Sequence, residues 1–274
     1  MEKRRIIVVL IFVIFVFSFA LGYFYIPVNG KIAREHSFYS PAGKLLVDSK
    51  YNEAISEFKE YLEEDPSNYY AHQGLGEAYY KISRFSDAKN EFKAALSLDP
   101  ADSLSQSSLG YSHYQLKEYD DAIEAFEKAL ELDPDYWSPY LGLGWTYYAI
   151  SHNSELETVK KLDYSKKAVS NFERSIELKD DDSYSSYLGL GHVYLWENYY
   201  KQADDPTKNF TTAIEVLQKS LELNPDEVGA YLGLGYAYQF ISDKSKAAEY
   251  FEKALELNPN ANEVKDNPKP IIFN

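Results

Sequence analysis

The chain has 274 residues, no cysteine and a formal net charge of -15 at pH 7. The absence of cysteine excludes disulfides, thiolate metal sites, cysteine nucleophiles and a lipid-modified N-terminal cysteine. Because so acidic a chain offers no basic stripe to neutralise phosphates, nucleic acid is not expected as a partner.

The N-terminal segment has the composition of a membrane anchor. Residues 1–5 carry Lys3, Arg4 and Arg5, and residues 6–28 form an uncharged, mostly apolar run. At a rise of about 1.5 Å per residue, such a run can span a hydrocarbon core of about 30 Å. Because a basic flank stays in the cytoplasm, we expect one N-terminal transmembrane helix, with the rest of the chain outside the cytoplasm.

A cleaved signal peptide is the alternative interpretation of this segment. Ser18-Phe19-Ala20 follows an apolar core, and cleavage after Ala20 would release a secreted protein. We favour the uncleaved anchor, since residues 21–28 continue the apolar run beyond such a cut. Residues 29–40 are too few for a domain and are expected to form a juxtamembrane linker.

From residue 41 the chain consists of near-copies of one pattern. In the clearest copy, Ala122, Phe126 and Ala129 recur at spacings of four and three, which places them on one face of a helix. Prolines end five of the copies, with a step of 34 residues between the first three and again between the last two, which indicates a repeat architecture. These prolines are Pro66, Pro100, Pro134, Pro225 and Pro259.

A second helix is expected before each of these, with a pattern that reads GLGWTYYAI from Gly142. A glycine inside a helix costs about 1 kcal/mol relative to alanine, so a glycine kept in five copies needs a packing reason. We expect that the missing side chain lets the partner helix come close. The glycines concerned are Gly76, Gly110, Gly144, Gly191 and Gly235.

The pair of helices, with Leu-Gly, a Tyr three residues after the Gly, then Ala, Phe, Ala-Leu and finally Pro, resembles the tetratricopeptide (TPR) repeat. The resemblance covers residues 41–259 and implies an all-α fold, a right-handed α-solenoid of about six TPR helix pairs. Single copies depart from the pattern: the first lacks Leu-Gly, His113 replaces the Tyr, Asp180 takes the place of the proline, and Leu217 replaces the Phe.

Two inserts, near residues 150–164 and near residues 197–210, interrupt the period. We expect them to lengthen the flanking helices, with Pro206 starting the later one. Inserts in solenoids often decorate a binding face, although tolerated drift would leave the same pattern. Residues 260–274 are expected to form a flexible tail, which would leave the last helix pair uncapped and open to self-association.

The resemblance also indicates where a partner would bind. In a TPR array one side of each leading helix lines a concave groove, and here that side is rich in aromatic residues, which are enriched in binding hot spots. The same residues could instead pack between repeats. The residues predicted for the groove are Tyr80, Tyr111, Tyr114, Leu141, Trp145, Tyr148, His192, Trp196, Tyr236 and Phe240.

The sequence therefore predicts a membrane-anchored, extracytoplasmic scaffold that binds a neutral or basic peptide or protein partner through an aromatic groove. The alternative is a glycan-binding accessory factor in surface polysaccharide or cell-wall assembly, because rings of Tyr and Trp suit sugar stacking. Enzyme activity, a cofactor and a metal site are not expected. The five histidines fall in different repeats or in the linker, and no two have the spacing of a metal site.

Overall fold

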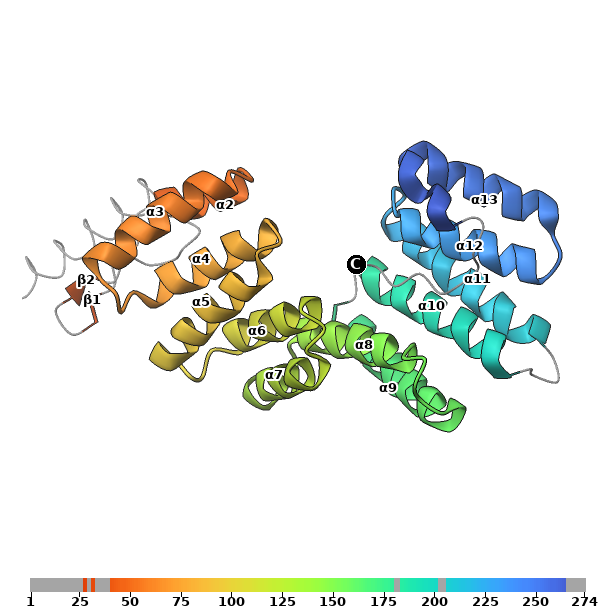
Figure 1. The fold of residues 1–274 in the computed structure, drawn as a ribbon, viewed down its shortest axis with the longest axis horizontal. Helices are drawn as coiled ribbons and strands as arrows, with labels where there is room; N and C mark the ends of the chain where they lie inside the picture. The colour runs from red at the N-terminus through yellow and green to blue at the C-terminus, as the bar shows by residue number, and fades with distance from the viewer. Residues whose placement is uncertain (1–26, 29–30, 33–39, 180–182, 202–205, 265–274) are drawn as a thin grey trace, which may run out of the picture. The chain divides into compact units, whose positions relative to one another are not determined.

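The computed structural model describes residues 27–28, 31–32, 40–179, 183–201 and 206–264, and within them the chain is built from helices (Figure 1). The α-helices pair in chain order as six leading and six trailing helices. The leading helices are α2 (Pro41–Val47), α4 (Tyr69–Lys81), α6 (Ser103–Gln115), α8 (Trp137–Ser151), α10 (Tyr184–Lys201) and α12 (Val228–Phe240). The trailing helices are α3 (Tyr51–Glu64), α5 (Phe85–Leu98), α7 (Tyr119–Leu132), α9 (Thr158–Lys179), α11 (Pro206–Leu223) and α13 (Lys244–Leu257).

Two short strands precede the helices. Strands β1 (Pro27–Val28) and β2 (Lys31–Ile32) pair antiparallel, with Pro27 opposite Ile32. The predicted membrane anchor over residues 6–28 lies outside the described residues except for its last two, which form β1. None of the helices in the described part of the chain combines the length and the apolar character that crossing a membrane requires.

The chain divides into two compact units, residues 1–99 and residues 100–274. In the first unit, a capped turn marks the start of α2. The side chain of Ser40 accepts a hydrogen bond of 2.9 Å from the backbone N–H of Gly43, and Pro41 occupies the first helical position. The first repeat therefore begins at Pro41 with a leading helix of 7 residues.

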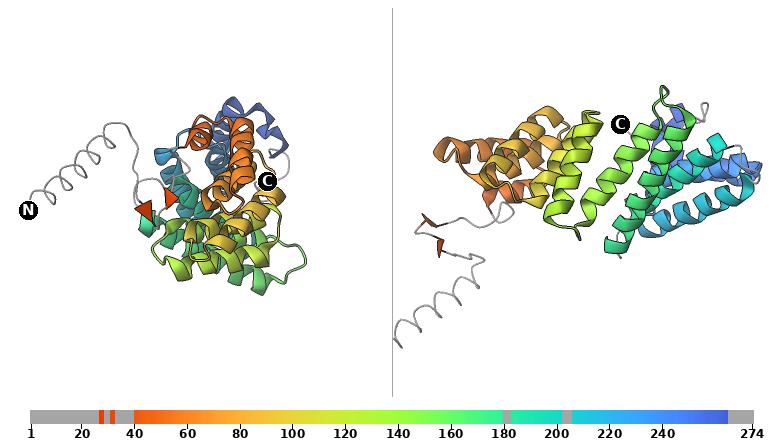
Figure 2. Two further views of the ribbon diagram at one scale, coloured as in Figure 1. Left: turned by 90° about the vertical axis from the view of Figure 1, so that its left-hand side faces the viewer. Right: turned by 90° about the horizontal axis from the view of Figure 1, so that it is seen from below.

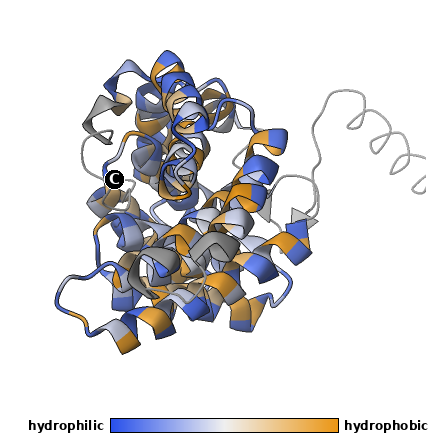
Figure 3. Cartoon of the chain, turned by 90° about the vertical axis from the view of Figure 1, so that its right-hand side faces the viewer, coloured by the Kyte–Doolittle hydropathy of each residue, from blue (hydrophilic) through white to orange (hydrophobic). Residues whose placement is uncertain are grey.

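The second unit contains α6 to α13. Each leading helix there contacts the next one, in the order α6, α8, α10 and α12, and each trailing helix α7, α9 and α11 contacts both its own leading helix and the following one. Figure 2 shows these helix pairs from two further sides. Hydrophobic and hydrophilic residues alternate along single helices in Figure 3, as expected for amphipathic helices that bury one face.

The glycines of the repeat pattern lie where large side chains of the trailing helices enter the core. A Cβ atom built on Gly110 would lie 2.7 Å from the ring of Phe126, and one on Gly142 would lie 2.2 Å from Cζ of the same ring. The packing role predicted for Gly110 is therefore confirmed, and Gly142, which was not among the predicted glycines, has the same role. One buried side chain thus lies between glycines of two successive leading helices. The same arrangement holds for Phe172 with Gly144 and Gly189, and for Leu217 with Gly191 and Gly233.

The inserts lengthen helices. The leading helices α4, α6 and α12 have 13 residues and the trailing helices α5, α7 and α13 have 14, whereas α8 has 15, α9 has 22, and α10 and α11 have 18 each. Helix α11 begins at Pro206, the position expected from the sequence. The added residues thus extend the helix pairs that carry them.

The last helix is followed by a short 3-10 helix, η1 (Pro259–Val264), which contacts α13. The expectation of a flexible tail from residue 260 is wrong for residues 260–264. Ala261 is 7% exposed and joins the hydrophobic core of the last repeats, and its N–H donates to the backbone carbonyl of Asn258 at 3.0 Å. Residues 265–274 of the predicted tail lie outside the described residues.

Candidate partner-binding surface

The predicted groove residues come from five leading helices, α4, α6, α8, α10 and α12. Tyr80 belongs to α4 in the first unit, where its ring meets Phe85 edge-on at 5.3 Å. The other nine lie in the second unit, on leading helices that contact one another in sequence. Their exposure divides them into two groups, one partly open to solvent and one buried.

Helix α6 contributes two partly exposed tyrosines. The ring of Tyr111 packs edge-on against the buried ring of Phe126, with centroids 4.9 Å apart, and its hydroxyl donates to the backbone carbonyl of Ser138 at 2.7 Å. That hydrogen bond ties α6 to the first turn of α8. Tyr114 lies near the tilted ring of Tyr119, with centroids 6.1 Å apart. Both tyrosines are held in place while part of each side chain stays accessible.

Helix α8 contributes Leu141 and Trp145, which are also partly exposed. The indole ring of Trp145 lies edge-on to the rings of Phe172 at 5.3 Å and Tyr148 at 5.7 Å. Trp145 therefore packs on the core with one side and contributes accessible aromatic surface with the rest.

Four predicted groove residues are buried, and three of them lie close together: Tyr148 is 3% exposed, His192 is 4% exposed and Trp196 is 7% exposed. They lie where α8 and α10 pack together, with the rings of Tyr148 and His192 6.3 Å apart. These three side chains therefore pack between successive leading helices. This is the alternative to a role in the groove.

His152, which was not predicted as a site residue, completes this cluster. Its ring stacks on Trp196 with a centroid distance of 3.9 Å, and its Nδ1 donates to the backbone carbonyl of Tyr148 at 2.6 Å. In shorter repeats the equivalent position, such as Glu118, is the N-cap of the trailing helix. The first insert extends α8, so His152 instead forms its C-cap. The insert was the signal in the sequence, but it did not indicate which ring His152 would contact.

The cluster is electrostatically unusual because ionisable groups sit in apolar surroundings. Burial lowers the pKa of His152 to about 4; the hydrogen bond to the Tyr148 carbonyl opposes this shift and nearby Lys161 adds to it. Burial, with a smaller effect of His152, also lowers the pKa of His192 to about 4. Burial raises the pKa of the Tyr148 hydroxyl above its usual range. At neutral pH all three side chains are therefore uncharged.

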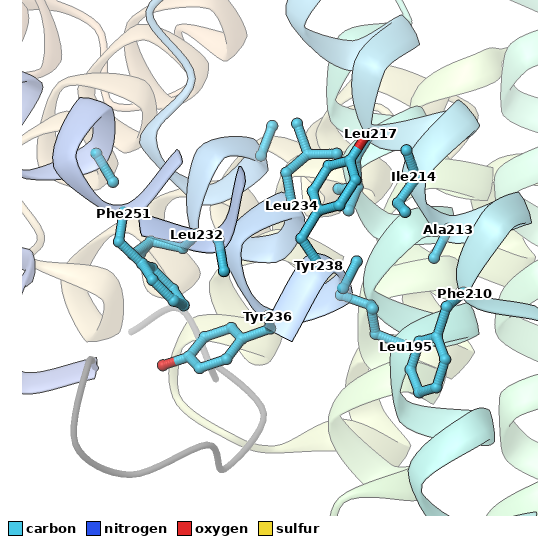
Figure 4. Close-up of a cluster of buried hydrophobic side chains, with 14 of the residues drawn as sticks. Leu195, Phe210, Ala213, Ile214, Leu217, Leu232, Leu234, Tyr236, Tyr238 and Phe251 are labelled. Atoms are coloured by element: carbon cyan, nitrogen blue, oxygen red, sulfur yellow. The ribbon is translucent and has the colours of Figure 1, made fainter. Parts of the chain in front are cut away.

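The last repeat holds the remaining two predicted residues, both on α12. Tyr236 is 7% exposed and meets Phe251 edge-on at 5.1 Å, and Figure 4 shows the two rings side by side. Burial raises the pKa of Tyr236 to about 12. Phe240 is 37% exposed and stacks on Phe210 of α11 at 5.0 Å. Phe240 is thus the most accessible of the predicted groove residues.

Comparison with protein families identifies this architecture. The tetratricopeptide repeat matches two stretches of the chain, residues 74–136 and residues 228–261. The tetratricopeptide repeat-containing protein trd-1 of Caenorhabditis elegans is 27% identical over 96 residues, which is 35% of this chain. The match spans only 11% of that relative's length.

Solved structures share the fold at low identity. A thermophilic TPR protein of Thermus thermophilus is 21% identical, with a TM-score of 0.58 over 71% of this chain and 93% of that one. The pilF protein of Pseudomonas aeruginosa is 18% identical, with a TM-score of 0.63 over 82% and 92%. PilW, a type IV pilus biogenesis factor, is 20% identical, with a TM-score of 0.56 over 70% and 78%.

These findings define the class of protein. The helices from α2 to α13 follow one another as helix pairs, and the stretches 74–136 and 228–261 match the tetratricopeptide repeat. Such a scaffold is consistent with protein–protein interaction.

Proposed function

We propose that this TPR scaffold binds an extended peptide or protein segment through an aromatic surface. This surface consists of the accessible parts of Tyr111, Tyr114, Trp145 and Phe240, all on leading helices of the second unit. The observation that carries the proposal is that these side chains stay accessible although each packs against a neighbouring ring. Held aromatic rings bind at low cost in rotamer entropy, and such residues are typical of binding hot spots.

The charge of the chain indicates the character of the partner. Because the net charge is -15, a neutral or basic segment would meet less repulsion than an acidic one. Binding of an envelope polysaccharide to the same rings, with no protein captured, would favour the glycan-binding alternative.

Replacing Tyr114 and Phe240 together with alanine should weaken binding of the captured partner by roughly 30-fold or more, the loss expected for hot-spot rings. The wild-type chain would first be used to capture and identify that partner, and both dissociation constants would then be measured by titration. Leu132→Ala is the matched control, since Leu132 is 43% exposed on the trailing helix α7. Equal affinity of the double variant and the wild type would contradict the proposal.

We also propose that residues 6–28 anchor the scaffold in the cell membrane, with the repeats outside the cytoplasm. The uncharged run and the basic flank before it support this proposal. The full chain should sediment with membranes, and a reporter enzyme that works only outside the cytoplasm should be active when fused after residue 264. A shorter chain released into the medium would instead indicate cleavage after Ala20, and an inactive reporter would overturn the proposed orientation.

A further inference from the structure

The turn between α6 and α7 brings together an imidazole and two carboxylates. Nδ1 of His113 lies 2.5 Å from Oε2 of Glu118 and 3.9 Å from Oδ2 of Asp121, and the three ligand atoms all lie within 4.8 Å of one another. In the described part of the chain, this is the one group of three or more such side chains close enough to share a metal ion. Its members lie within one short stretch of sequence, across one tight turn.

The turn is well defined before any ligand binds. His113 is 6% exposed, so packing fixes its ring, and the backbone N–H of Glu118 donates to the carbonyl of His113 at 3.0 Å. Lys117, between them, has a left-handed φ of 62° that closes the turn. Asp121 is exposed in the first turn of α7. The site therefore has one buried ligand, one partly exposed ligand and one side open to solvent.

The fourth and sixth repeats provide an independent observation, because there a protein cation occupies the corresponding place. A tyrosine stands where the third repeat has His113, and a lysine stands where it has Asp121. In those two repeats the lysine Nζ lies over the tyrosine ring, close enough for a cation–π contact. The pairs are Tyr147 with Lys167 at 5.6 Å and Tyr238 with Lys246 at 4.8 Å. The third repeat thus has His113 in place of the tyrosine and Asp121 in place of the lysine. Both replacements are side chains that can bind a cation.

We propose that His113, Glu118 and Asp121 bind a divalent transition-metal ion of the zinc type, which takes the place of the lysine ammonium group. One nitrogen and two oxygen ligands suit Zn²⁺, whose tetrahedral ligands lie about 3.4 Å apart at bond lengths of about 2.1 Å. The two distances from Nδ1 of His113, 2.5 Å and 3.9 Å, bracket that value, so small rotations of the two carboxylates complete the site. The fourth position faces solvent and is open to water or to a ligand atom from a partner.

Titration of the full chain in detergent with zinc chloride, followed by competition with a chromophoric chelator, tests the proposal. The wild type should bind one high-affinity ion. His113→Tyr introduces the residue that the fourth and sixth repeats have at this position, so the variant should fold. Its affinity for zinc should fall by more than the roughly 10- to 100-fold that follows the loss of a residue that only supports a metal ligand. Asp121→Lys should behave in the same way.

Two further measurements separate this site from general binding to an acidic chain. His72→Gln removes a histidine that has a single carboxylate neighbour, Glu91 at 2.7 Å, and should leave zinc affinity unchanged. Cobalt(II) bound to the wild type should give the intense visible absorption of a tetrahedral site, and His113→Tyr should abolish it. Failure of the wild type to bind zinc, or equal affinity of wild type and His113→Tyr, would overturn the proposal, whatever the outcome of the partner-binding tests.

Discussion

Replacing Phe172 with alanine should lower the free energy of unfolding of the second unit by about 3–5 kcal/mol. Phe172 is fully buried, and its ring lies between Gly144 of α8 and Gly189 of α10. Because the ring fills the space that these two glycines leave open, its removal creates a cavity between successive repeats. Denaturant unfolding followed by circular dichroism measures the change. A loss below about 1 kcal/mol would mean that the repeats pack independently of this ring.

The glycines provide the complementary test of the same packing. A Cβ atom on Gly189 would lie 2.3 Å from Cζ of Phe172, whereas one on Gly233 would lie 2.9 Å from Cδ1 of Leu217. Gly189→Ala should therefore lower the free energy of unfolding by about 1–3 kcal/mol, after the gain in helix propensity is included. Gly233→Ala should cost clearly less, because the end of a leucine can rotate away and a rigid ring cannot. Equal costs would contradict this explanation.

Lowering the pH from 7 to 5 should destabilise the second unit by about 2 kcal/mol for each of His152 and His192. Both have a pKa of about 4 in the folded chain, below the usual value of 6.5. Between these two values the unfolded chain binds more protons than the folded one. Stability is therefore highest above pH 6.5, falls as the pH falls toward 4, and has lost this contribution below pH 4.

The double variant His152→Gln with His192→Tyr is the control for this prediction. Tyr111 and Tyr236 occupy the position of His192 in other repeats, so tyrosine is compatible with the fold there. The titration of surface carboxylates is common to both proteins and cancels in the comparison. Unfolding measured at pH 7 and at pH 5 should show a smaller loss for the double variant. The same loss in both proteins would mean that neither histidine is buried as described.

Much of this fold follows from the spacing of residues in the sequence. Ala122 and Phe126 recur with helical periodicity, and Phe126 is fully buried as their pattern requires. Gly110 and Gly144 could be assigned to close packing because a glycine inside a helix has a cost that a close contact explains. The start of α11 at Pro206 also followed from the sequence.

The candidate surface could be predicted only in part. The helical period separates the two sides of a leading helix, but it does not indicate whether the second side meets solvent or the next leading helix. Tyr148 and Trp196 are buried against a neighbouring leading helix, whereas Tyr114 and Phe240 stay accessible. The spacing of the five histidines did not indicate the group around His113, because the other two side chains of this group are carboxylates that the turn into α7 brings close.

The central claim, that the aromatic surface holds the partner, is tested most directly by photo-cross-linking in cells. A photoreactive residue would replace Tyr114 on the leading helix α6, and a matched probe would replace the exposed Glu127 on the trailing helix α7. We expect the probe at position 114 to capture one dominant protein, identified by mass spectrometry, and the probe at position 127 not to capture it. Capture of the same protein from position 127 alone would contradict the account.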